Sequence, residues 1–138
     1  MKENILTKIK VRDWKEAIRA VGGLLETAGS VTPNYTEAMI NAITELGPYI
    51  VILPNFALAH AAPSKEVLRD DVALITLSEP VRFGSPNDPI YVILAICSKD
   101  GQSHLDSLGA IASILMREGT LPKLIGAETV EDVLEIMG

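Results

Sequence analysis

Residues 55–63 read Asn55-Phe56-Ala57-Leu58-Ala59-His60-Ala61-Ala62-Pro63, a short apolar run that leads directly into a histidine and a proline-containing loop. A second apolar run, Tyr49–Leu53, comes just before it, and only Pro54-Asn55 separates the two. Both runs are short, partly β-branched and bounded by residues that break regular structure, which is typical of strands. We therefore predict two strands here, with His60 at the end of the second.

The rest of the chain alternates between strand-like and helix-like segments. Asn4–Val11, Val72–Leu77 and Ile90–Cys97 are three further predicted strands. Apolar residues with a 3.6-residue repeat predict helices, which lie over about 14–28, 35–46, 104–118 and 130–137. This order predicts an α/β fold in which helices flank both sides of a mixed, about five-stranded β-sheet. The short Pro54-Asn55 connection indicates that some neighbouring strands are antiparallel.

The first predicted helix carries two local signals. Asp13 can cap its N-terminus, and Glu16 three residues later completes the pattern of a capping box. Gly22 and Gly23 lie in its middle, where each glycine costs about 1 kcal/mol of helix propensity relative to alanine. Close packing against a neighbouring element would explain these glycines.

The size and composition of the chain limit its class. A length of 138 residues fits one compact domain over residues 1–138, and 48% apolar residues with only 4% aromatics predict an aliphatic core. The formal net charge of −6 argues against a nucleic-acid partner. We find no apolar run of about 18 residues and no secretory leader pattern, and Cys97 is the single cysteine. These features predict a cytoplasmic protein without an internal disulfide.

The two histidines of the chain are the candidate functional residues. His60 ends a predicted strand, and ligand sites in α/β sheets gather at such ends. His104 lies at the predicted start of a helix, where free N–H groups and the helix dipole favour anions. If the two ends meet, an imidazole nucleophile faces a phosphate-binding helix start. With an ordinary pKa of about 6.5, histidine is largely neutral and nucleophilic at physiological pH.

Other interpretations of these residues compete with a phosphate site. Spacing alone favours two ordinary histidines, one partly buried at a strand end and one at a helix start. Two histidines and Cys97 do not match a zinc spacing, so no metal site is expected. Cys97 in an apolar strand is typical of an inert packing group. The sequence has no glycine-rich phosphate loop and no Gly-x-Ser-x-Gly motif.

The segment Gly47–Ala61 closely resembles the active-site segment of the mannitol/fructose-type IIA domains, which belong to the bacterial phosphoenolpyruvate-dependent sugar phosphotransferase system. Its Gly-Pro-Tyr-Ile-Val-Ile lead-in, with the later Phe83–Pro89 segment, is most similar to the ascorbate-specific branch. The likeness covers nearly the whole chain. It implies a mixed five-stranded sheet flanked by helices, His60 as the phosphoryl acceptor and His104 as a second histidine that supports the phosphoryl group.

The resemblance also marks where this sequence departs from the family. Ala59 replaces the usual proline before the histidine, and Ala62 stands where related proteins often carry an arginine. Asn41 occupies a region where mannitol-type members place an arginine near the phosphate. Asn41 and Ser103, which precedes His104, are the remaining expected phosphate-binding residues. Fewer cations weaken the stabilisation of a dianionic phosphoryl group. Three other basic residues could substitute: Lys65, Arg69 and Arg82.

The function that the resemblance implies is that of a phosphoryl carrier. His60 would accept the group from phospho-HPr and pass it to a cognate IIB component working with a membrane IIC component, without metal or organic cofactor. The sugar would be ascorbate or a related pentose or polyol. Two alternatives stay open: a regulatory IIA-like phosphoprotein, and a relative that binds a partner without accepting phosphate. The sequence leaves open the phosphorylated ring nitrogen of His60 (tele or pros) and the formation of a homodimer.

Overall fold

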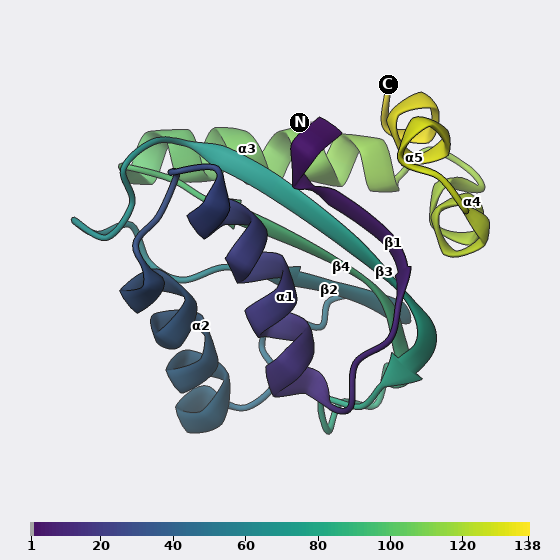
Figure 1. The fold of residues 1–138 in the computed structure, drawn as a ribbon, viewed down its shortest axis with the longest axis horizontal. Helices are drawn as coiled ribbons and strands as arrows, with labels where there is room; N and C mark the ends of the chain where they lie inside the picture. Colours follow the sequence, from purple (N-terminus) through teal and green to yellow (C-terminus); the bar gives the residue numbers. More distant parts are fainter. Residues whose placement is uncertain (1) are drawn as a thin grey trace.

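The computed structural model describes residues 2–138 and is built around a mixed four-stranded sheet with the strand order β1-β3-β4-β2 (Figure 1). The strands are β1 (Ile5–Ile9), β2 (Asn55–Ala59), β3 (Asp71–Val81) and β4 (Ile90–Cys97). Strand β1 runs parallel to β3, β3 runs antiparallel to β4, and β4 runs parallel to β2. The prediction of a mixed sheet is therefore confirmed.

Helices cover both faces of this sheet, as predicted. A short 3₁₀ turn, η1 (Lys2–Asn4), precedes β1. The helices are α1 (Trp14–Thr27), α2 (Pro33–Leu46), α3 (Gly101–Leu115), α4 (Thr120–Gly126) and α5 (Val130–Met137). Helices α1 and α2 pack on one face and form one apolar core with it, whereas α3, α4 and α5 form a second core on the other face (Figure 1). None of the helices within residues 2–138 combines the length and apolarity that crossing a membrane requires.

The predicted strand over Tyr49–Leu53 does not form, which is why the sheet has four strands and the expected count of about five is wrong. After α2 the backbone turns, with Gly47 at φ +83° and the Val51 N–H donating to the Pro48 carbonyl. Ile50 is fully buried, so its apolar character reflects packing against the core and not pairing in a sheet. The segment contacts β2 through two backbone hydrogen bonds, from Leu58 N to Ile50 O at 2.9 Å and from Phe56 N to Leu53 O at 3.2 Å.

The expected antiparallel pairing across Pro54-Asn55 is also wrong. This connection makes only an isolated bridge between Leu53 and Phe56, and Asn55 adopts a left-handed conformation with φ +70°. The antiparallel neighbours are instead β3 and β4, which a longer turn-rich connection joins.

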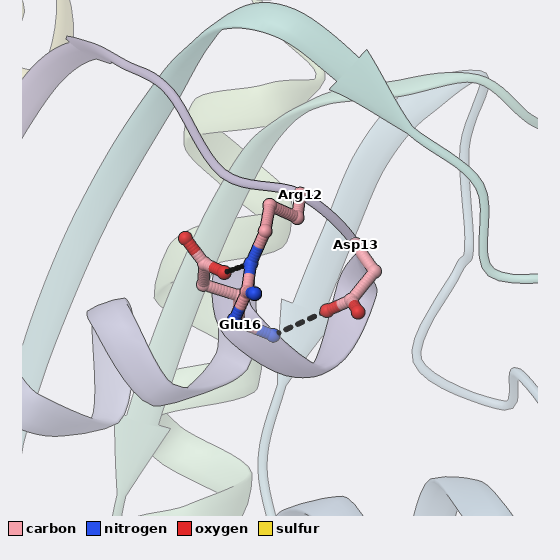
Figure 2. Close-up of polar contacts among 3 residues, drawn as sticks. All are labelled: Arg12, Asp13 and Glu16. Carbon is pink, nitrogen blue, oxygen red and sulfur yellow. Dashed lines mark hydrogen bonds and ion pairs between the residues drawn. The ribbon is translucent and has the colours of Figure 1, made fainter.

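The start of α1 shows half of the predicted capping box (Figure 2). The Asp13 carboxylate accepts a hydrogen bond from Glu16 N at 2.9 Å. The Glu16 carboxylate accepts from Arg12 Nε at 2.6 Å, so it pairs with this arginine and does not complete the box (Figure 2). An exposed i, i+4 pair of this kind adds only a few tenths of a kcal/mol, roughly 0.3–0.5.

Close packing of α1 against α2 accounts for one of the two central glycines. A Cβ atom built on Gly22 would lie 2.5 Å from Thr36 Oγ1, so the two helices approach more closely here than a side chain permits. A Cβ on Gly23 would meet no atom within 4 Å. The packing explanation therefore holds for Gly22 and not for Gly23.

The candidate site lies at the carboxyl ends of two neighbouring strands. Because β2 and β4 are parallel, with Ala59 paired to Ala95, both strands end at the same edge. His60 follows β2 directly, and α3 begins shortly after β4 ends.

Candidate functional site

The structure brings the two histidines of the chain together. His60 comes from the end of β2 and His104 from the first turn of α3. Their ring centroids lie 5.5 Å apart with a tilt of 50° between the ring planes. Both side chains are half-buried, so the pair is reachable from solvent while it borders the sheet.

Local backbone geometry fixes the tautomer of His60. Its Nδ1 lies 2.8 Å from the carbonyl oxygen of Leu58. A carbonyl can only accept a hydrogen bond, so Nδ1 carries the proton of the neutral ring. The lone pair of Nε2 is then left free, so Nε2 is the ring atom that can bond to an electrophile or accept a hydrogen bond.

Burial keeps this ring neutral. Removal from solvent lowers the pKa of His60 below its ordinary value, and the electrostatic interaction with the neighbouring His104 lowers it further. The hydrogen bond to the Leu58 carbonyl acts in the opposite direction, but the net shift of the pKa is downward. At neutral pH His60 is therefore an uncharged base with a free lone pair.

Two tyrosines hold the backbone around His60. The Tyr49 hydroxyl donates to the His60 carbonyl oxygen at 2.6 Å, and its ring meets the imidazole edge to face at 5.2 Å. The Tyr35 hydroxyl donates to the Ile96 carbonyl at 2.8 Å and accepts from Ala61 N at 3.1 Å. Burial raises the pKa of Tyr35 to about 12, so it stays a neutral donor. The two hydrogen bonds of the Tyr35 hydroxyl connect Ile96 near the end of β4 with Ala61 just after β2.

Neither tyrosine is predicted as a site residue by the sequence patterns. Those patterns assign Tyr49 to a strand and place Tyr35 only at the approximate start of a helix. A chemical signal exists for Tyr35, which is buried, because a buried tyrosine hydroxyl usually finds a hydrogen-bond partner. No such signal marks the half-buried Tyr49.

The start of α3 is occupied by its own cap. Asp100 accepts from Ser103 N at 2.8 Å, and the Ser103 hydroxyl bonds back toward the Asp100 backbone, which makes a capping box. The same hydroxyl lies 3.3 Å from Asp70 Oδ1. The expectation of free N–H groups at this helix start is therefore wrong for Ser103, because its backbone N–H already donates to the Asp100 carboxylate.

Asn41, the remaining expected phosphate-binding residue, and Arg69, a basic residue that could substitute, make no observed contact with either histidine among the residues that the structure describes. Asn41 is exposed on α2, and its side chain makes no hydrogen bond to any residue that the structure describes. Arg69 donates from Nε to Ser30 Oγ at 2.9 Å and from Nη2 to the Ala28 carbonyl at 2.8 Å, which ties it to the end of α1.

The other two basic candidates, Arg82 and Lys65, likewise make no observed contact with the histidine pair. Arg82 follows Val81, which pairs with Ile90 at the start of β4, so it lies at the sheet edge opposite to His60. Lys65 is exposed in the connection between β2 and β3. Among the described residues, none of these cations is seen to pair with either histidine.

Neither a metal site nor a thiol nucleophile emerges. No group of three or more His, Cys, Asp or Glu residues with ligand geometry occurs within residues 2–138. Cys97 is buried, and burial raises the pKa of its thiol to about 12. Its Sγ donates to the Arg69 carbonyl at 3.4 Å, which is typical of a packed, unreactive thiol.

Comparisons with known proteins agree on one family. The family model for the "Phosphoenolpyruvate-dependent sugar phosphotransferase system, EIIA 2" matches residues 1–138. The "Ascorbate-specific PTS system EIIA component" of Escherichia coli (strain K12) is 27% identical over 137 residues, which cover 98% of this chain and 89% of that protein.

Solved structures show the same fold. A putative PTS IIA from Streptococcus mutans superposes with a TM-score of 0.91 at 30% identity, covering 99% of this chain and 87% of that one. A chain from the complex of enzyme IIAMTL and phosphorylated enzyme IIBMTL of Escherichia coli has a TM-score of 0.87 at 27% identity, covering 98% of this chain and 94% of that one.

Proposed function

Because this chain belongs to the EIIA 2 family of the phosphoenolpyruvate-dependent sugar phosphotransferase system, and is therefore a phosphotransferase component, we propose that His60 Nε2 is its phosphoryl-accepting atom. The observation that carries the proposal is the 2.8 Å contact between His60 Nδ1 and the Leu58 carbonyl. It directs the proton to Nδ1 and the lone pair to Nε2, so the product is a tele-phosphohistidine.

The transfer step is an in-line displacement on phosphorus. The Nε2 lone pair of His60 forms the new N–P bond while the N–P bond of phospho-HPr breaks and its electron pair returns to the carrier's imidazole. The Nδ1 proton stays on His60, and the Leu58 carbonyl stabilises the positive charge that develops on the ring. Such a step requires positioning and charge stabilisation, and this scheme assigns no role to a metal.

His104 is the supporting residue of this proposal. Its ring lies beside that of His60, with the centroids 5.5 Å apart. An N–H of His104 donated to a phosphoryl oxygen would stabilise the group, since hydrogen bonds to charged oxygens are stronger than those between neutral partners. Because His60 is already deprotonated at Nε2, His104 does not need to act as a general base.

The names of the relatives support the acceptor and the sugar that we propose. The IIAMTL of Escherichia coli forms its complex with a phosphorylated enzyme IIBMTL, which supports a cognate IIB component as the acceptor here. The relative from Escherichia coli (strain K12) is named ascorbate-specific. We therefore assign this chain to the uptake and phosphorylation of ascorbate or a related pentose or polyol, together with a membrane IIC component.

Labelling tests the assignment directly. The chain is incubated with enzyme I, HPr and labelled phosphoenolpyruvate, and the bound label is measured. We expect acid-labile, alkali-stable label in the wild type and none in His60→Ala. His104→Ala serves as the matched histidine control and should retain label at a reduced rate. Acid-labile label that survives His60→Ala would overturn the proposal.

A further inference from the structure

Ser98 carries an orphaned polar group. Its side chain is only 1% exposed, and its Oγ is the single buried side-chain nitrogen or oxygen without a hydrogen-bond partner among residues 2–138. A buried hydroxyl that gives up water without gaining a partner is destabilising, and such groups are rare in native proteins. This hydroxyl therefore requires an explanation outside the packing of the free protein.

The pleat of β4 shows which face Ser98 belongs to. Successive side chains of a strand point to opposite faces. Leu94 and Ile96 belong to the core under α3, α4 and α5, whereas Ala95 and Cys97 belong to the core under α1 and α2. Ser98 is next in this alternation, which places it on the α3 face.

His60 lies on the same face by the same argument. Ala59 and Ala61 belong to the core under α1 and α2, and Leu58 belongs to the core on the α3 side. His60, between the two alanines, is therefore directed to the α3 face.

The strand register brings the two residues close. Ala59 pairs with Ala95 in parallel strands, so His60 is level with Ile96 and Ser98 lies one pleat period beyond. The chain then enters α3, whose first turn carries His104 against the His60 ring. Ser98 thus directly follows β4, the neighbour of the strand that leads to His60, and comes shortly before the helix that supplies the second histidine.

We propose that Ser98 is a further phosphate-binding residue, whose hydroxyl donates a hydrogen bond to a phosphoryl oxygen on His60. This inference rests on the proposed function, since it requires the phosphoryl group at Nε2. Phosphorylation supplies three acceptor oxygens to a donor that has none in the free protein. Arg69 is tied to Ser30 and Ala28, and the Ser98 hydroxyl, a neutral donor, takes a share of the stabilisation that cations would otherwise give.

The test compares Ser98→Ala with Ser113→Ala, which removes an exposed hydroxyl from α3. The equilibrium of phosphoryl transfer between HPr and this chain is measured for each, together with the rate of phosphohistidine hydrolysis and the ³¹P chemical shift. Ser98→Ala should shift the equilibrium toward phospho-HPr by about tenfold, the effect of losing one hydrogen bond to a charged group. Ser113→Ala should match the wild type.

The stability of the unphosphorylated protein separates a functional role from a structural one. Because the hydroxyl has no partner there, Ser98→Ala should leave the free energy of unfolding unchanged or raise it. A loss of stability or of folding in Ser98→Ala would overturn the proposal, since it would reveal a structural partner. An unchanged transfer equilibrium would also overturn it, while label at His60 would leave the proposed function standing. A wild type without label at His60 would instead overturn the proposed function, and this inference with it.

Discussion

The Nδ1 atom of His60 and the carbonyl oxygen of Leu58 lie 2.8 Å apart, within the same strand end. Leu58 is held in β2 by its pairing with Leu94 of β4, and its own N–H bonds to Ile50. The carbonyl that orients the imidazole is thus part of the rigid sheet. The imidazole therefore receives its orientation from the strand that carries it. In the proposed function His104 is not needed to orient this ring and can contact the phosphoryl group instead.

The lowered pKa of His60 predicts how phosphoryl acceptance depends on pH. In the proposed function the neutral ring is the nucleophile, so acceptance should fall only when the pH drops below about 6.5, the ordinary pKa of histidine. An NMR titration of the imidazole from about pH 8 to about pH 5 measures this pKa. His104→Ala should move the pKa of His60 upward, because the second ring lowers it. A His60 that titrates above about 6.5 would contradict this account.

The same shift predicts a pH dependence of stability. In the unfolded chain His60 has a pKa of about 6.5, whereas burial lowers the pKa in the folded state. As the pH falls through this interval the unfolded state binds the proton first, so the free energy of unfolding decreases. This loss of stability is complete below the pKa of the folded state and absent above the pKa of the unfolded state. Urea unfolding of wild type and His60→Gln across this interval should show a shallower dependence in the variant.

Tyr49 should act on both stability and reactivity. Tyr49→Phe keeps the edge-to-face ring contact with His60 but removes the hydroxyl that donates to the His60 carbonyl at 2.6 Å. Loss of one such hydrogen bond should lower the free energy of unfolding by about 1 kcal/mol and slow phosphoryl labelling of His60. The half-buried Tyr91, whose hydroxyl makes no hydrogen bond to the described residues, provides the control Tyr91→Phe. Equal effects of the two variants would argue against a specific role of Tyr49.

Local patterns were sufficient to predict the elements that carry the histidines. The apolar run before His60 and the helical repeat after His104 are short-range signals, and both elements form. Tyr49–Leu53 has the same apolar composition as a strand, but it lies beside the edge strand β2 as a turn. An apolar run indicates that a segment is buried, but it does not indicate whether the backbone pairs with a strand. The sequence alone therefore could not distinguish this turn from a strand.

The details of the site depend on contacts between residues far apart in the chain. The bond between Tyr35 and Ile96 joins residues 61 positions apart, and the contact of Ser103 with Asp70 spans 33. No periodicity encodes such pairs. Asp100, just before the predicted start of α3, was visible in the sequence, and its preference for helix N-termini could have indicated that this start is already capped.

The two central glycines of α1 offer a paired test of packing. Alanine at Gly22 would place its Cβ 2.5 Å from Thr36 Oγ1 and 2.7 Å from Thr36 Cγ2. Thr36 is buried and its Oγ1 donates to the Glu26 carboxylate at 2.6 Å, so it cannot move aside freely. Gly22→Ala should therefore lower the free energy of unfolding by about 1–3 kcal/mol, as overpacking of a core does.

Gly23→Ala is the matched control for this prediction, because the same substitution one residue later meets no atom within 4 Å. Alanine is a better helix former than glycine, so Gly23→Ala should raise the free energy of unfolding by up to about 1 kcal/mol. Urea unfolding followed by circular dichroism measures both variants, and labelling of His60 should persist in each, since the changes lie on α1. If the two substitutions changed stability in the same direction and by the same amount, helix propensity alone would explain the data and the close approach of α1 to α2 would have no energetic consequence.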